Sequence, residues 1–232
     1  MKIIIKNSTF QIGYDEKLFK IFFTCYNEAI IKSITKTKII LGATTTEKYN
    51  TLAFTAISVQ TFQQFQEELE RETGEKKMNY ESILKMTHNL ATQLNYLITN
   101  NSKTFLGYSP ENLIVIDKNK FIYLSDEYLL DIDNEQIIIT FPFTKDDFFL
   151  SPELLKITEI PSFINYKVSY FSFAYLILYG LTGCDILLTK LNINDEKINS
   201  EPELSFIKNT KLYWLLKRCL IEEPKNRSII FI

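Results

Sequence analysis

Short runs of alternating or clustered β-branched and aromatic residues dominate residues 1 to about 60. This pattern is typical of strands that are half-buried in a sheet. It predicts five strands: Lys2–Ile5, Thr9–Tyr14, Leu18–Thr24, Thr37–Thr44 and Thr51–Val59. Between the third and fourth runs, Tyr26–Ile34 predicts a short helix that carries Glu28. Because a helix stands among strands, we expect an α+β class.

Beyond residue 60 the apolar residues recur at the spacing of helices. Phe62–Arg71 is helix-prone and is followed by a stop at Thr73-Gly74. Asn79–Ile98 predicts the longest helix, with Asn79 as its cap and an apolar stripe along one face. Two further helices are predicted at Tyr166–Leu181, which ends at Gly183, and at Lys211–Ile221. The segment between them, Leu187–Glu203, is expected to be a polar connector.

A hairpin is predicted between the second and third of these helices. Leu113–Ile116 and Phe121–Leu124 are short β-rich runs around a four-residue polar turn. The preceding stretch, Phe105–Asn112, is expected to be a loop because Pro110 fixes its own backbone and keeps Ser109 extended. Asn112 stands at the entry of the hairpin and Asp126 at its exit. The ends of paired strands lie close together, so these oxygens form a candidate Mg²⁺ site.

The composition of the chain argues against several classes of function. The chain of 232 residues has a net charge of −2 and scattered lysines, so no nucleic-acid-binding or membrane-binding surface is predicted. The longest nearly apolar run, Val168–Leu181, is too short to span a bilayer. Three widely spaced cysteines give no disulfide framework, which fits a reducing, cytoplasmic location. His88, the single histidine, has no second His or neighbouring Cys, so we expect a structural role for it.

The loop and hairpin resemble the catalytic loop and metal-binding hairpin of the protein kinases, which read His-Arg-Asp-x-Lys-Pro-Glu-Asn and Asp-Phe-Gly. The matching residues are Pro110, Glu111, Asn112 and Asp126. The family's catalytic Asp falls on Gly107 and its phosphate-facing Lys on Ser109, while its Phe-Gly falls on Glu127-Tyr128. The chain also has only six glycines and no Gly-x-Gly, so the phosphate-cradling loop of a working kinase is missing.

Later segments carry the resemblance further. Ser151-Pro152-Glu153 resembles the family's Ala-Pro-Glu, and Ser169–Ala174 resembles its Asp-x-Trp-Ser-x-Gly, with Ser169 in place of the Asp that holds the catalytic loop. Glu222–Arg227 resembles the helix end Asp-Pro-x-x-Arg. In the family this Arg pairs with the Glu of Ala-Pro-Glu, so the resemblance predicts an ion pair between Glu153 and Arg227.

The resemblance implies an α+β, two-lobed kinase-like fold, with a reduced β-rich lobe over residues 1–60 and a mainly helical lobe over residues 61–232. It implies a pseudokinase: a catalytically inactive domain that binds another protein as a scaffold or regulator. Binding of ATP with Mg²⁺ at Asn112 and Asp126 stays open, and the alternative is that both side chains satisfy backbone groups of the loop. The alternative is a weakly active serine/threonine kinase that uses Asp146 or Asp147 as a substitute base.

Two subsidiary points stay open. Lys20 and Glu28 are the candidates for the family's Lys–Glu pair, and the alternative is that both are ordinary surface charges. The rings of Phe141, Phe143, Phe148 and Phe149 are the candidate partner surface, and the alternative is that they are buried against the larger lobe.

Overall fold

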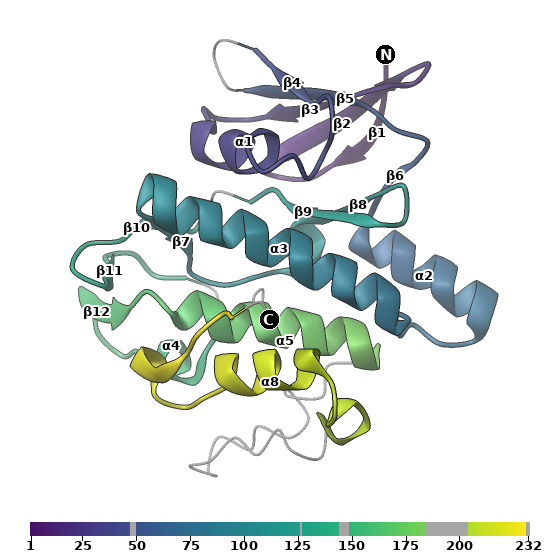
Figure 1. The fold of residues 1–232 in the computed structure, drawn as a ribbon. Coiled ribbons are helices and arrows are strands. Elements are labelled where there is room, and N and C mark those ends of the chain that lie inside the picture. The colour runs from purple at the N-terminus through teal and green to yellow at the C-terminus, as the bar shows by residue number, and fades with distance from the viewer. Residues whose placement is uncertain (47–49, 126, 144–148, 184–203, 231–232) are drawn as a thin grey trace.

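The computed structural model describes residues 1–46, 50–125, 127–143, 149–183 and 204–230 (Figure 1). The chain is of the mixed α+β class, as predicted. One end of the molecule is a five-stranded antiparallel sheet in the order β1-β2-β3-β5-β4. Its strands are β1 (Lys2–Lys6), β2 (Phe10–Asp15), β3 (Leu18–Phe23), β4 (Thr44–Thr45) and β5 (Thr51–Thr55).

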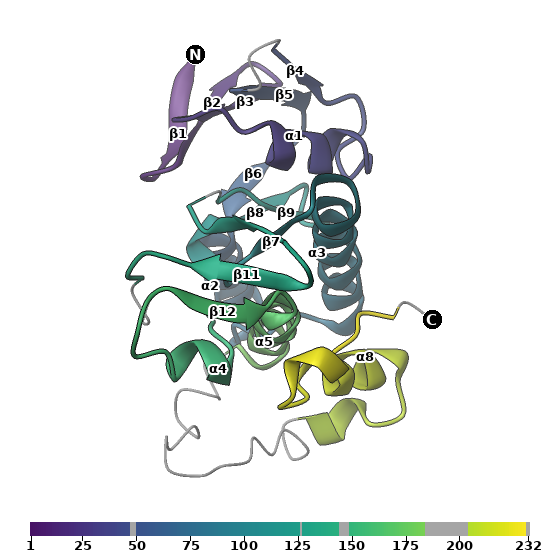
Figure 2. The same ribbon diagram turned by 90° about the vertical axis from the view of Figure 1, so that its left-hand side faces the viewer.

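Helix α1 (Glu28–Thr35) lies between this sheet and the long helix α3 (Tyr80–Asn101) (Figures 1 and 2). Ile30, Ile31 and Ile34 of α1 are fully buried. Gln93 of α3 connects three elements, because its amide donates to Ser33 Oγ of α1 at 3.2 Å and to the Tyr123 carbonyl at 2.8 Å. Its side-chain oxygen also accepts from Tyr123 N at 3.0 Å.

The predicted strand Thr37–Thr44 is wrong, because the chain forms turns there and only Thr44–Thr45 pair as a strand. Lys38 has a φ of 59°, a left-handed conformation that a strand does not contain. The predicted strand Thr51–Val59 is two strands in different sheets, β5 and β6 (Val59–Thr61). Between them Ile57 is 94% exposed, and the Asp117 carboxylate accepts from the amides of Ile57 and Ser58.

The helices follow the predictions closely. α2 (Phe62–Thr73) ends at Gly74 and α5 (Val168–Thr182) at Gly183, both glycines being left-handed, and Asn79 caps α3 by accepting from Ser82 N. The remaining helices are α4 (Pro152–Leu155) and α8 (Lys211–Cys219), with 3₁₀ turns η1 (Pro110–Asn112), η2 (Ser205–Ile207) and η3 (Pro224–Asn226). Among the described residues, every helix is too short or too polar to cross a bilayer.

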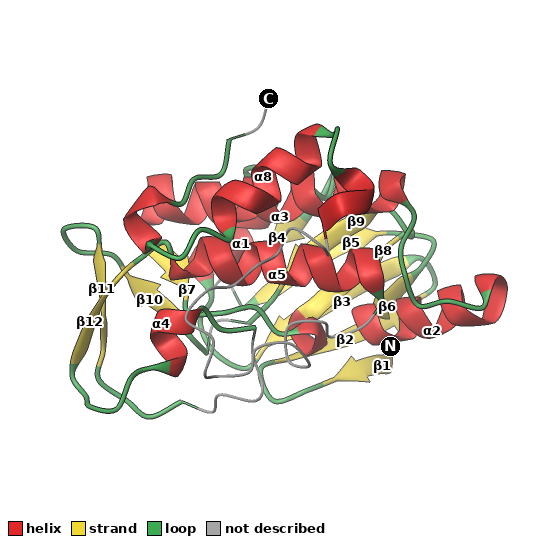
Figure 3. Cartoon of the chain, turned by 90° about the horizontal axis from the view of Figure 1, so that it is seen from below, coloured by secondary structure: helices red, strands yellow, loops and turns green. Residues whose placement is uncertain are grey.

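Helix α5 lies under α3 and is buried on nearly all sides, which explains why its sequence is apolar almost throughout (Figure 1). The hairpin β8 (Leu113–Ile116) and β9 (Lys120–Tyr123) forms a three-stranded sheet with β6. Two small ribbons, β7 (Lys103–Phe105) with β10 (Leu129–Asp131) and β11 (Gln136–Ile139) with β12 (Ser162–Asn165), lie at the end opposite α2 (Figure 3). Of the predicted run Gln136–Phe143, only Gln136–Ile139 is a strand.

Candidate functional site

The loop between β7 and β8 is held in one shape by short local contacts. Ser109 is extended, as predicted, and its hydroxyl accepts from Glu111 N at 3.3 Å. Pro110–Asn112 then forms a single 3₁₀ turn, so the loop ends in helical geometry that the sequence did not predict. Beyond it, Leu124 N donates to the Asn112 carbonyl at 3.0 Å and closes the base of the hairpin. The loop is therefore rigidly joined to both strands.

Tyr123 fills the inside of this loop. Its hydroxyl accepts from Ser109 N at 3.1 Å and donates to the Gly107 carbonyl at 3.4 Å. Its ring packs against Phe105 and Tyr108, with centroids 4.9 and 4.7 Å away. Burial raises the pKa of the Tyr123 phenol, so it stays a neutral donor. Gly107 is buried in this setting and contributes backbone alone to the loop.

Two serines of α5 contact the loop and the strand that precedes it. Tyr108 N donates to Ser172 Oγ at 2.6 Å, and Thr104 Oγ1 donates to Ser169 Oγ at 2.7 Å. Ser172 therefore binds the backbone of the loop itself. Ser169, which stands where the resemblance expects the Asp that holds the loop, binds the Thr104 side chain in strand β7, before the loop begins. A hydroxyl accepts a backbone N–H as a carboxylate does, but without a charge.

Asn112 lies beside the turn between β1 and β2. Asn7 Nδ2 donates to Asn112 Oδ1 at 3.1 Å, across a sequence separation of 105 residues. The orientation of Asn7 is fixed, because its Oδ1 accepts from Thr9 N at 2.9 Å and Phe10 N at 2.8 Å. Sequence reasoning missed Asn7. The available signal was an Asn between two strands, where it favours a turn by binding the backbone that follows it.

The side-chain oxygen of Asn112 is the atom that would coordinate Mg²⁺, and in this structure it accepts a hydrogen bond from Asn7 Nδ2. The described residues contain no cluster of His, Cys, Asp or Glu suited to a metal. Asp126, the other half of the predicted site, and the candidate bases Asp146 and Asp147 lie outside the described residues.

The predicted ion pair between Glu153 and Arg227 is present. Arg227 Nη1 and Nη2 donate to the two carboxylate oxygens at 2.5 and 2.9 Å, a bidentate geometry. Arg227 is completely buried, while the Glu153 side chain is 21% exposed. The guanidinium also lies 5.1 Å from the Phe171 ring centroid, and its other hydrogen bonds go to the carbonyls of Ile221, Glu222 and Lys167.

The remaining residues that the sequence analysis singled out lie away from the loop between β7 and β8. Glu28 pairs with Lys32 one turn along α1 and not with Lys20, and the Lys32 and Tyr26 hydrogen bonds lower its pKa. His88 is exposed on α3. Phe149 is 8% exposed and stacks on Tyr175, so it is buried and not part of a partner surface. The half-buried rings of Phe141 and Phe143 pack at a small hydrophobic cluster that includes Ile137 and Ile139 of β11, Phe141 by stacking on Tyr128. Phe148 lies outside the described residues.

The chain matches no protein-family model, and no curated protein matches it at a significant level. The functional assignment therefore depends on the geometry described above.

Proposed function

We propose that this protein is a pseudokinase: a domain with a two-lobed, protein-kinase-like fold that binds another protein and does not transfer phosphate. The proposed lobes are residues 1–60 and 61–232. Support comes from the order of elements, since a five-stranded antiparallel sheet with one inserted helix precedes a mainly helical part containing the loop and hairpin. The chain leaves the five-stranded sheet at Thr55, close to the proposed boundary.

The observation that carries the proposal is the backbone-only contribution of Gly107. At the position where the resemblance expects an Asp, Gly107 presents a carbonyl that accepts from Tyr123. A carbonyl cannot take up a proton from a substrate hydroxyl, and general-base help is worth about 10²–10⁴-fold in rate. Ser109, at the position of the phosphate-facing Lys, uses its hydroxyl to cap the following turn. Neither residue supplies what phosphoryl transfer requires.

The residues that support the architecture are retained. The Glu153–Arg227 pair joins α4 to the segment that follows η3, and Ser172 of α5 binds the loop backbone. A chain that keeps these contacts but lacks the groups for catalysis is expected where surface, and not chemistry, is the function. ATP with Mg²⁺ is not needed for such a role.

A phosphoryl-transfer assay tests the proposal. The purified protein at high concentration, incubated with Mg²⁺ and γ-labelled ATP, is expected to label neither itself nor a generic protein substrate. The Asp126→Ala variant serves as the control, because label that appears with the wild type and disappears with this variant would establish the kinase alternative. A thermal-shift titration with millimolar Mg–ATP reports separately on binding, since a ligand of the native state raises its melting temperature.

A further inference from the structure

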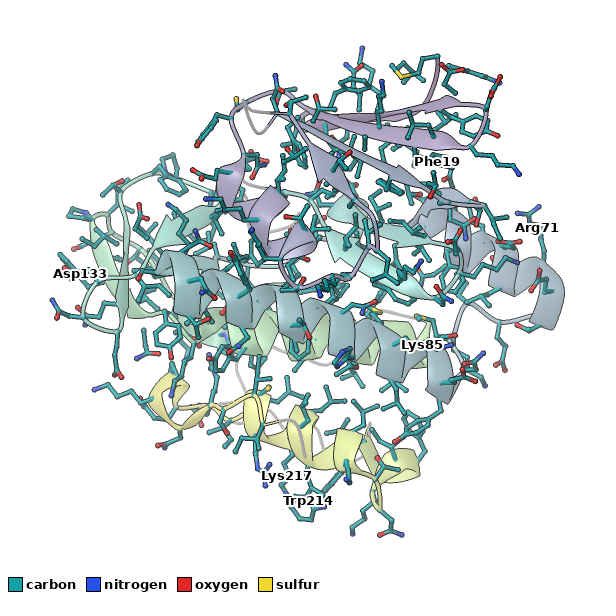
Figure 4. The ribbon with its side chains drawn as sticks, turned by 45° about the horizontal axis from the view of Figure 1, so that its top comes forward. Phe19, Arg71, Lys85, Asp133, Trp214 and Lys217 are labelled. Carbon is teal, nitrogen blue, oxygen red and sulfur yellow. The ribbon has the colours of Figure 1, made fainter. Side chains whose placement is uncertain are left out.

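The ribbon of β11 and β12 has an open strand edge within the described part of the chain. β12 pairs with β11, and no other described strand pairs with it. The ribbon lies at the periphery of the molecule, at the end where Asp133 is labelled (Figures 3 and 4). The outer side of β12 can therefore form backbone hydrogen bonds with a further strand.

The exposed face of the ribbon is apolar beside this edge. Ile138 of β11 and Phe163 of β12 are directly opposite each other and are 43% and 61% exposed. Ile137, the neighbour of Ile138 in the strand, is fully buried, because successive side chains point to opposite faces. An exposed apolar pair gains free energy when further apolar side chains extend it and exclude water.

β1 and β12 are both edge strands, but only β1 carries features that hinder pairing with another strand. Lys2 and Lys6 stand at the two ends of β1, and a bulge interrupts its register between Ile3 and Ile5. Lysines and bulges are the usual protection of an exposed edge. β12 reads Ser-Phe-Ile-Asn, has a regular register with β11 and contains no charged residue. It is therefore the edge suited to association.

The charges that flank β12 are complementary to those of a second copy. Glu159 precedes the strand, Lys167 follows it, and no charged residue lies between them. In an antiparallel pair of two β12 strands with Phe163 opposite Phe163, the residue four positions before Phe163 faces the residue four positions after it. Glu159 of each copy then faces Lys167 of the other, which is a favourable cross-strand pair.

Both flanking charges are available for this contact. Within the described residues the Glu159 carboxylate has no ionic partner, and the Lys167 ammonium donates only to the Lys225 carbonyl, at 2.9 Å. An ammonium has three N–H donors, so two remain. The acidic residues Asp133 and Glu135 belong to the turn before β11 and are one strand further from the open edge. The complementarity therefore comes from the charges that face each other and not from net charge.

We propose that two copies of this chain associate through β12 as a symmetric antiparallel pair centred on Phe163. The two ribbons then form one four-stranded sheet, and Ile138 and Phe163 of both copies make one continuous apolar stripe on its exposed face. Such an interface uses the same surface on each copy and is closed by a two-fold axis. This self-association is independent of the proposed function, because it depends on an edge strand and not on the loop at Gly107.

Sedimentation velocity of the full chain tests the interface. Between about 1 and 200 µM the weight-average mass should rise from the 27.2 kDa of one chain toward twice that value. A reducing agent prevents cross-linking through the exposed Cys25. Phe163→Asp places two carboxylates opposite each other at the axis and should weaken the dimer at least about tenfold. Phe206→Asp is the matched control, since Phe206 is also 61% exposed but lies in η2, and it should dimerise as the wild type does.

An exchange of charges tests the register. Glu159→Lys alone and Lys167→Glu alone each place like charges opposite each other, and the two-fold axis repeats the contact, so each variant should dimerise about tenfold more weakly. An equimolar mixture of the two variants should regain the wild-type affinity, because each copy then faces opposite charges. Glu16→Lys, on the exposed β2–β3 turn, is the control for the change of charge and should dimerise as the wild type does.

Three results would overturn the proposed interface: a mass of 27.2 kDa at every concentration, a dimer that Phe163→Asp leaves intact, or a mixture of the charge variants that associates no better than either alone. Circular dichroism should show unchanged secondary structure for every variant, since Phe163 and Glu159 are exposed. These failures leave the non-catalytic function intact, because that depends on the phosphoryl-transfer assay. Conversely, phosphoryl transfer by the wild type would refute the proposed function whatever the mass measurements show.

Discussion

Replacing Glu153 by Gln tests the energetic role of the Glu153–Arg227 pair. Gln keeps the shape of the side chain and one hydrogen-bond acceptor but removes its charge. The guanidinium of Arg227 would then remain completely buried with no carboxylate beside it. Its hydrogen bonds to the carbonyls of Ile221, Glu222 and Lys167 would persist and would satisfy its donors in part. The variant therefore isolates the loss of charge compensation.

The expected loss in the free energy of unfolding follows from the burial of Arg227. Breaking a buried pair by removing one partner costs about 3–5 kcal/mol, whereas an exposed pair is worth about 0–1 kcal/mol. Because the charge left behind is the fully buried one, the buried case applies. The 21% exposure of the Glu153 side chain lets water reach that side and moves the expectation to the lower end, about 3 kcal/mol. This is a large part of the roughly 5–15 kcal/mol that stabilises a typical domain.

Equilibrium urea unfolding, followed by circular dichroism and by Trp214 fluorescence, measures this loss. Glu222→Gln is the matched control: it removes an equal charge next to Arg227, but the Glu222 side chain is exposed and only its backbone carbonyl contacts the guanidinium. The control should change the free energy of unfolding by no more than about 0.5 kcal/mol. A loss below about 1 kcal/mol for Glu153→Gln would show that the pair behaves as a surface pair and that the reasoning from burial is wrong.

Three further predictions concern local contacts. Asn7→Asp keeps the side-chain acceptor for the backbone amides of the β1–β2 turn but removes the N–H donor to Asn112. It should lower the free energy of unfolding in the same urea assay by about 1 kcal/mol. An unchanged free energy of unfolding would show that the contact contributes nothing. Ser172→Ala leaves the buried Tyr108 amide without its acceptor and should cost about 1–3 kcal/mol, against no measurable loss if water takes the place of the hydroxyl. Burial raises the pKa of the Cys219 thiol from 9.0 to about 12, so between these pH values the unfolded state releases a proton that the folded state retains. Stability should therefore fall as pH rises above 9, by up to about 1.4 kcal/mol per pH unit, and Cys219→Ala should show a shallower fall; parallel curves would refute this.

Local chemistry made the helices predictable. Asn79 and Gly183 occupy the two kinds of helix end for which their side chains are suited, and both act as expected. The strand prediction was wrong at Thr37–Thr44. Ile39 and Ile40 are buried there, but they lie in a turn and not in a sheet. Apolar β-branched residues indicate burial, and the backbone that achieves the burial is decided by tertiary context.

The site was predicted only where the contacts are short in sequence or implied by the resemblance. The hairpin beside Asn112 and the partner of Arg227 belong to this group. The Asn7–Asn112 contact joins residues 105 positions apart, and no local pattern encodes it. Likewise, the two bonds from Gln93 to Tyr123 need the packing of α3 on β9, which a helix pattern alone does not define.

The proposed function requires that a chain with Gly107, where the resemblance expects a proton-accepting Asp, does not transfer phosphate. Formation of ADP from Mg–ATP tests it most directly, because every kinase converts ATP to ADP whatever its acceptor. We expect micromolar wild-type protein and the Asp126→Ala variant to form ADP at the same rate as a protein-free blank. A wild-type rate above the blank that Asp126→Ala abolishes would refute the proposed function.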